Sequence, residues 1–135
     1  MKKFLILFVL SATILLLGWN QEIPRAKMEN GKKAYDKYCL SCHMSNGEGV
    51  PRMTPSLVKS KYVSHTKTQL IRIILLGSEA LAGEPQRVYK NIMAPLDNMT
   101  DQEISDAATY VRNSFGNKGT MITPGDVKYV RARIH

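Results

Sequence analysis

Cys39, Cys42 and His43 bring two thiols and an imidazole within five consecutive positions of the chain. They belong to the stretch CLSCH, and the 135 residues contain no other cysteine. If this stretch winds as a helical turn, the three side chains stand at positions i, i+3 and i+4 and share one face. Thiols and an imidazole in this arrangement suit three kinds of chemistry: a disulfide or redox pair, a zinc site, or covalent attachment of haem.

The rest of the chain favours haem over the other two chemistries. A thioredoxin-like redox pair needs a βαβ pattern, and no run of alternating or β-branched residues lies near the cysteines. A structural zinc site needs four ligands, and the only further histidines are His65 and His135. In haem attachment each thiol adds to one vinyl group, and the histidine supplies an axial iron ligand. The motif therefore predicts one haem held by Cys39, Cys42 and His43.

The first twenty residues indicate that the protein is exported. Lys2 and Lys3 precede an apolar run over residues 4–17, which is short for crossing a hydrocarbon core of roughly 30 Å. The pattern is typical of a signal peptide, but no A-x-A cleavage site follows, and an uncleaved membrane anchor remains an alternative. We therefore expect residues 1–20 to be a signal peptide or anchor. The protein would then be periplasmic, either soluble or attached to the outer face of the inner membrane.

Two longer stretches carry a family resemblance. The segments NGKKAYDKYCLSCHMSNGEGVPRMTPSL and NIMAPLDNMTDQEISDAATYVRNSFGN resemble class I c-type cytochromes, most of all the small single-haem cytochromes that serve periplasmic dehydrogenases and respiratory oxidases. The resemblance runs from about Glu29 to Asn117. It implies an all-α fold of three to five helices around one covalently attached haem, with a cytochrome domain over residues 27–118 and a C-terminal tail with a short helix over 119–135.

The same resemblance implies two further site residues. Pro55 stands twelve positions after His43, where the family has a proline whose carbonyl accepts a hydrogen bond from the histidine Nδ1. Met93, in the stretch NIMAPLDN, matches the family's methionine ligand and is expected to be the sixth ligand of the iron. Many family members have proline directly after this methionine, where this chain has Ala94.

Met99 is the main rival to Met93, because it also precedes the last long helical pattern. It has a structural explanation of its own: with Thr100 as N-cap, Met99 and Ile104 stand where a hydrophobic staple forms. The other methionines lie too near the haem motif, before it, or beyond the region of resemblance: Met28, Met44, Met53 and Met121.

Helix signals are clear along the chain and no convincing strand is present. We expect a first helix over 28–37, in which Gly31 indicates close approach of another backbone. The resemblance places that neighbour at Tyr110. Further helices are expected from a cap at Thr66 to Gly77, from Thr100 to about residue 115, and after a Thr123 cap with proline at the first helical position. Loops are expected over 44–56 and over 78–91, the latter with a short turn after Pro85.

Charge suggests a kind of partner. The formal net charge is +8, and lysines and arginines flank the haem motif on both sides. We expect these residues to steer an acidic redox partner, a dehydrogenase or a terminal oxidase. The residues concerned are Lys32, Lys33, Lys37, Arg52, Lys59, Lys61 and Lys67. Nucleic acid is a poor alternative, because the protein is exported and lacks interleaved aromatic residues.

Two functional classes fit a haem bound in this way. An electron carrier has both axial positions filled, whereas a haem enzyme or gas sensor needs an open sixth position and a distal acid-base group. His65 is the only internal candidate for such a group, and it stands directly before the Thr66 helix cap. Because a methionine ligand is available, we expect an electron carrier and not an enzyme.

Overall fold

The computed structural model describes residues 22–83 and 89–134. In these residues the fold is all-α, and the extended backbone forms only one isolated bridge, between Val50 and Thr54. The helices are α2 (Arg25–Tyr38), α3 (Leu40–His43), α4 (Lys61–Ser64), α5 (Lys67–Leu76), the 3-10 helix η1 (Gly77–Leu81), α6 (Asp101–Arg112) and α7 (Pro124–Arg131). The predicted all-α class is confirmed. The expected signal segment and the turn after Pro85 lie outside the described residues.

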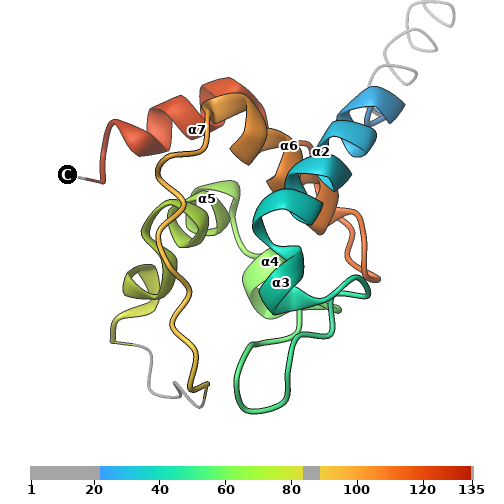
Figure 1. The fold of residues 1–135 in the computed structure, drawn as a ribbon. Coiled ribbons are helices and arrows are strands. Elements are labelled where there is room, and N and C mark those ends of the chain that lie inside the picture. Colours follow the sequence, from blue (N-terminus) through green and yellow to red (C-terminus); the bar gives the residue numbers. More distant parts are fainter. Residues whose placement is uncertain (1–21, 84–88, 135) are drawn as a thin grey trace, which may run out of the picture.

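Helices α2 and α6 pack directly against each other (Figure 1). Their crossing is made possible by Gly31, where an added Cβ would overlap the Asp106 carbonyl oxygen and lie 2.6 Å from the Tyr110 Cβ. This confirms the expectation that Gly31 marks a close approach to another helix near Tyr110. A side chain at position 31 would force the two helices apart.

The predicted helix starts are confirmed by their caps. The Thr66 hydroxyl accepts a hydrogen bond from the Gln69 amide, which is one half of a capping box. The α6 and α7 starts each form a complete box, Thr100 with Glu103 and Thr123 with Asp126. Each box satisfies two amides that would otherwise lack a partner at the helix start.

Two helix ends differ from the expected boundaries. The first helix begins three residues early, at Arg25, because the Pro24 carbonyl accepts the amides of residues 27 and 28. Helix α6 ends at Arg112 and not near residue 115, because Asn113 leaves the helical region with φ −127° and ψ 15°. The Asn117 side-chain amide then donates to the Val111 carbonyl at 3.0 Å and so replaces a helical hydrogen bond.

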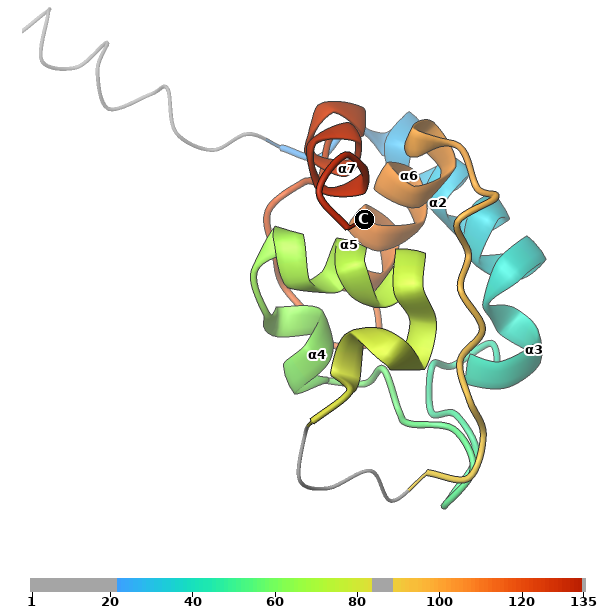
Figure 2. The same cartoon turned by 90° about the vertical axis from the view of Figure 1, so that its left-hand side faces the viewer.

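Helix α7 lies over α5 and α6 and completes the main hydrophobic core (Figure 2). Ile122, Val127 and Val130 from this part of the chain are buried in one cluster with residues of α5 and α6. The buried Thr109 hydroxyl of α6 accepts from the Ile122 amide at 3.0 Å. The segment over residues 119–134 is therefore packed into the same core as the helices before it.

Arg131 of α7 also holds the chain that leads into α6. Its guanidinium donates to the carbonyls of Asp97 and Met99, both at 2.7 Å, and to the Asp101 carboxylate at 2.9 Å. The segment over residues 97–101 is thus fixed from the C-terminal helix. No helix in residues 22–83 and 89–134 has the length and apolar character needed to cross a membrane.

Candidate haem-binding site

The junction of α2 and α3 carries Cys39, Cys42 and His43. The Cys39 carbonyl accepts from the amides of Cys42 and His43, at 3.2 and 2.9 Å, so the stretch winds as a helical turn. All three side chains line one cavity of about 300 Å³. The two cysteines form no disulfide with each other. Burial, with the neighbouring Cys42 as a second cause, raises the pKa of the Cys39 thiol to about 11.

His43 is buried and held by one hydrogen bond. Its Nδ1 lies 3.1 Å from the Pro55 carbonyl oxygen, and because a carbonyl can only accept, Nδ1 must carry the proton. The Nε2 atom then keeps its lone pair and has no hydrogen-bond partner among the described residues. Burial lowers the pKa of His43, although the Pro55 bond opposes this shift. The imidazole is therefore neutral and oriented to bind a metal through Nε2.

A tight loop presents the Pro55 carbonyl to His43. Gly49 adopts φ +66° and its amide donates to the His43 carbonyl at 3.1 Å. A Cβ at Gly49 would lie 2.7 Å from the Pro55 carbonyl oxygen, the atom that accepts the His43 bond. Position 49 therefore needs a glycine on two counts, backbone conformation and space. The sequence predicts no site role for Gly49, although this residue lies in a loop that contains two glycines.

The cavity walls come mainly from α5, α6 and the chain before α6. They are mostly aliphatic, and include Leu70, Ile73, Ile74, Ala107, Ala108 and Val111. A smaller set of polar side chains also lines the cavity, among them Thr54, Ser56, Ser60 and Asn91. The Asn91 side-chain amide donates to the Thr54 hydroxyl at 3.2 Å and ties the loop before α6 to the loop after His43.

Met93 is half-buried and lines the same cavity as His43. It lies in the extended segment before α6, which runs beside α5 and η1 in both ribbon views (Figures 1 and 2). Its rival Met99 also lines the cavity but is only 2% exposed and belongs to the main core cluster together with Ile104. A hydrophobic staple between Met99 and Ile104 would place Met99 in such a cluster.

His65, the only internal candidate for a distal acid-base group, lies away from this cavity. Its side chain is exposed and is not part of the cavity lining. Its carbonyl instead accepts a hydrogen bond from the Arg112 guanidinium at 2.8 Å. The structure thus brings together Cys39, Cys42, His43, Pro55 and Met93, and leaves His65 apart from them.

Several of the expected docking lysines are paired with carboxylates. Lys32 bonds Asp36 at 2.6 Å, Lys37 bonds Glu103 at 3.4 Å, and Lys67 bonds Asp126 at 3.3 Å. Lys33 and Lys59 also belong to the expected docking face. Neither forms an ion pair with a carboxylate among the described residues.

The chain matches the protein family described as cytochrome c over residues 28–115, and it belongs to that family. Together with its all-α fold, this makes it a class I c-type cytochrome, and its cofactor is covalently bound haem c with its iron. The matched domain is an electron-transfer domain.

Three relatives illustrate the range of similar proteins. The chain is 29% identical over 124 residues to the cytochrome c subunit of a quinone alcohol dehydrogenase of Gluconacetobacter polyoxogenes, covering 90% of this chain and 25% of the relative. It is 31% identical over 111 residues to the fructose dehydrogenase cytochrome subunit of Gluconobacter japonicus, covering 78% and 23%. It is 26% identical over 115 residues to cytochrome c-552 of Thermus thermophilus, covering 77% and 86%. The chain thus spans about a quarter of the dehydrogenase subunits it matches.

The residues around the cavity fit this cofactor. Two cysteine side chains that form no disulfide stand one helical turn apart on the cavity wall. A neutral imidazole and a soft thioether line the same space, and both are known haem ligands. The remaining wall is largely apolar, as a porphyrin face requires.

Proposed function

We propose that this protein is a monohaem cytochrome that passes single electrons between periplasmic or membrane-bound redox partners, with His43 and Met93 as axial ligands and Cys39 and Cys42 as the covalent attachment points. The observation that carries the proposal is a single cavity lined by both thiols, by His43 and by Met93. When bound, haem supplies a one-electron iron couple.

The protein's own residues determine how that couple behaves. The Pro55 carbonyl orients His43 and increases the electron density on its Nε2. A neutral thioether at Met93 favours the reduced iron relative to a more basic ligand, and so raises the potential. The apolar walls on α5 and α6 limit access of water, which disfavours the more highly charged oxidised state.

We further propose how the chain is organised and where it works. Residues 1–20 act as an export signal or a membrane anchor, and residues 27–118 form the cytochrome domain, followed by the 119–135 tail. Two of the relatives are described as cytochrome subunits of dehydrogenases. We therefore expect the partner to be a dehydrogenase or a terminal oxidase that docks through an acidic face.

One measurement tests the attachment directly. After acid denaturation, the intact mass of the protein should exceed that of the polypeptide by one haem, because thioether bonds survive unfolding. The Cys42→Ser variant should keep at most one thioether bond, while Ser41→Ala, its neighbour in the same turn, should retain both. A purified protein with the mass of the bare polypeptide would contradict the proposal.

A further inference from the structure

Met93 is tied to one residue by both of its backbone polar groups. Its amide donates to the Ser78 hydroxyl at 2.8 Å, and its carbonyl accepts from the Ser78 amide at 2.9 Å. Ser78 lies in η1, fifteen residues earlier in the chain. A pair of bonds to one residue fixes both the position and the rotation of the Met93 peptide groups.

The turn before Ser78 is shaped to allow this contact. Gly77 ends α5 with φ +61°, and a Cβ at this position would overlap the Met93 carbonyl oxygen and lie 2.8 Å from the Ala94 carbonyl carbon. One turn earlier, the Ile74 carbonyl accepts from the Leu96 amide at 3.0 Å. The end of α5 and the start of η1 therefore hold the segment 93–96 at three successive points.

Local backbone stiffness cannot replace these contacts at Met93 itself. Pro95 restricts the residue that precedes it, which is Ala94, and leaves the Met93 dihedrals free. The side chain of Met93 adds three rotatable bonds of its own. Any lasting restraint on where its sulfur points must therefore come from contacts made by other parts of the chain.

We infer that Ser78 is a positioning residue for the axial methionine: by holding the Met93 backbone from both sides, it keeps the thioether directed into the cavity. The inference rests on the proposed role of Met93 as iron ligand. Removing the Ser78 hydroxyl leaves the Met93 amide without its partner and lets the segment move away from the cavity. An external ligand then competes more effectively for the sixth position.

The test uses the haem-loaded full chain and imidazole as the competing ligand. Ser78→Ala should bind imidazole about two- to tenfold more tightly in the ferric state, the range expected for loss of one net hydrogen bond. The potential should fall, and the iron–thioether charge-transfer band should weaken. Ser78→Thr keeps a hydroxyl and should restore all three values.

Ser105→Ala is the matched control. The Ser105 hydroxyl accepts from Lys27 at 3.0 Å and donates to the Gln102 carbonyl at 3.0 Å, in a buried part of α6 that does not line the cavity. This variant loses the same chemical group and should unfold more easily, yet its imidazole affinity and potential should stay unchanged. If Ser78→Ala behaves like Ser105→Ala, the inference is wrong.

Two further measurements separate the possible failures. If Met93→Ala keeps the charge-transfer band, Met93 is not the ligand and the proposed ligation itself fails. If Met93→Ala loses the band while Ser78→Ala keeps normal imidazole affinity, only the positioning role fails.

In the unmodified protein the Met93 amide should exchange slowly with solvent, because it is hydrogen-bonded, and rapid exchange would overturn the inference without any variant.

Discussion

Two methionine side chains reach the cavity, and their surroundings give them different tasks. Met93 is half-buried and its backbone is bonded to Ser78, whereas Met99 is 2% exposed within the main core. A ligand must reach the iron from a fixed backbone, while a core residue must fill space among its neighbours. Single substitutions at the two positions should therefore damage different properties.

Met93→Ala should yield a high-spin or water-ligated haem that binds carbon monoxide readily and has a potential lower by on the order of 0.1 V. Optical spectroscopy and redox titration measure these changes. Met99→Ala should keep the low-spin spectrum and instead lose about 2–5 kcal/mol of stability, the usual cost of truncating a buried methionine. An exchange of these two behaviours would assign the sixth ligand to Met99.

The site residues differ in how far the sequence alone reveals them. Cys39, Cys42 and His43 are adjacent in the chain, so their spacing predicts their chemistry directly. Met93 and Pro55 were found only through the family resemblance. The sequence does not predict the role of Ser78, because that role depends on hydrogen bonds to a residue fifteen positions away. Neither Ser78 nor its neighbours form a local pattern that indicates such a contact.

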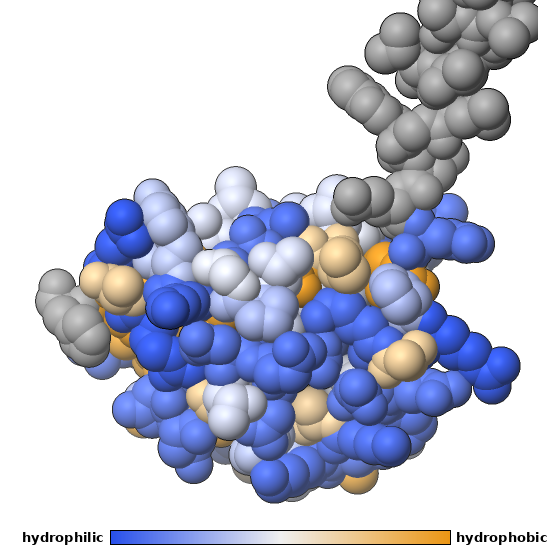
Figure 3. All heavy atoms as spheres, turned by 90° about the horizontal axis from the view of Figure 1, so that it is seen from above, coloured by the Kyte–Doolittle hydropathy of each residue, from blue (hydrophilic) through white to orange (hydrophobic). Residues whose placement is uncertain are grey.

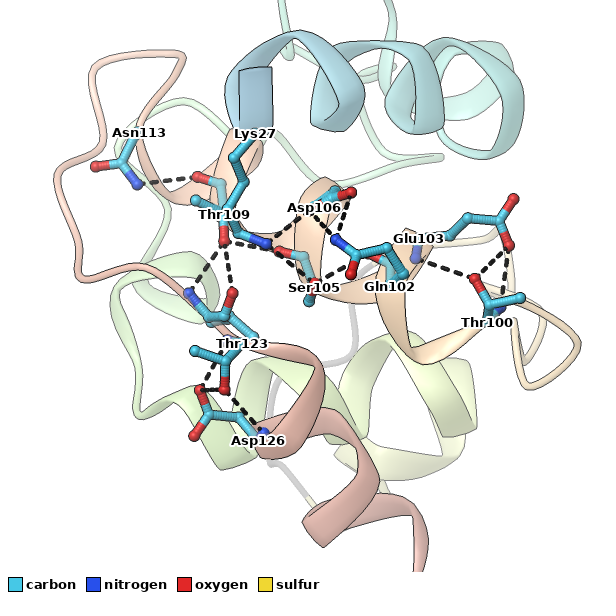
Figure 4. Close-up of polar contacts among 11 residues, drawn as sticks. Lys27, Thr100, Gln102, Glu103, Ser105, Asp106, Thr109, Asn113, Thr123 and Asp126 are labelled. Atoms are coloured by element: carbon cyan, nitrogen blue, oxygen red, sulfur yellow. Dashed lines mark hydrogen bonds and ion pairs between the residues drawn. The ribbon is translucent and has the colours of Figure 1, made fainter. Parts of the chain in front are cut away.

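Helix α6 contacts four other helices, α2, α4, α5 and α7. Figure 4 shows its polar side: the Lys27 ammonium of α2 bonds the Asp106 carboxylate at 2.6 Å, and the Gln102 side chain donates to the same carboxylate. At its start, Glu103 accepts from the Thr100 amide and from the Tyr38 hydroxyl. The Lys27–Asp106 and Tyr38–Glu103 bonds attach α6 to α2, the helix that leads into the haem motif.

Glu103 should make the stability of this helix start depend on pH. The Thr100 backbone bond, followed by the Tyr38 and Thr100 hydroxyls, lowers the pKa of Glu103 to about 2, against an ordinary value of 4.5. Since the folded-state pKa is depressed, the stabilisation is complete above pH 4.5 and is lost as the pH falls towards 2.

The Glu103→Gln variant should therefore be less stable than the unsubstituted protein at pH 7, and the difference should disappear as the pH approaches 2. Denaturant midpoints measured at a series of pH values test this. Glu48→Gln is a suitable control, because the Glu48 carboxylate is exposed and has no hydrogen-bond partner in the described residues. A difference between Glu103→Gln and the parent that stays constant with pH would refute the assignment.

The caps of α5, α6 and α7 were predictable because capping is local: three consecutive residues after the cap contain its partner. The end of α6 was not, since it depends on Asn117 folding back to the Val111 carbonyl. The short helices α3 and α4 have four residues each, too few to show a periodic apolar pattern.

For the molecule as a whole, steering of an acidic partner stays a prediction, and two of the lysines expected to contribute to it are paired with carboxylates. Viewed from above in Figure 3, the surface is covered mainly by polar and charged side chains, with apolar atoms in small patches. The net charge remains positive, yet Lys32 and Lys37 share their charge with nearby carboxylates. Lys59 stands in the chain between Leu57 and Ser60, and both of these residues line the cavity.

Lys59→Gln should slow electron transfer with an acidic partner by about twofold at low salt, the effect of one unit charge at roughly 10 Å in water. Stopped-flow rates at increasing ionic strength measure it, and the difference should vanish near 1 M salt, where the Debye length is about 3 Å. Lys128→Gln, an exposed residue of α7 that does not line the cavity, removes the same charge and should have a smaller effect. Equal effects, or rates that do not respond to salt, would argue against steering near the cavity.

The three hydrogen bonds of Arg131 connect the segment before α6 to a helix that lies beyond the family match. The family match ends at residue 115, but the guanidinium that holds residues 97–101 comes from sixteen positions later. Local opening of α7 would release those carbonyls and, with them, the segment that follows the methionine. A fragment limited to residues 28–115 would keep the residues of the expected haem site but would lack Arg131, whose three hydrogen bonds hold the segment before α6.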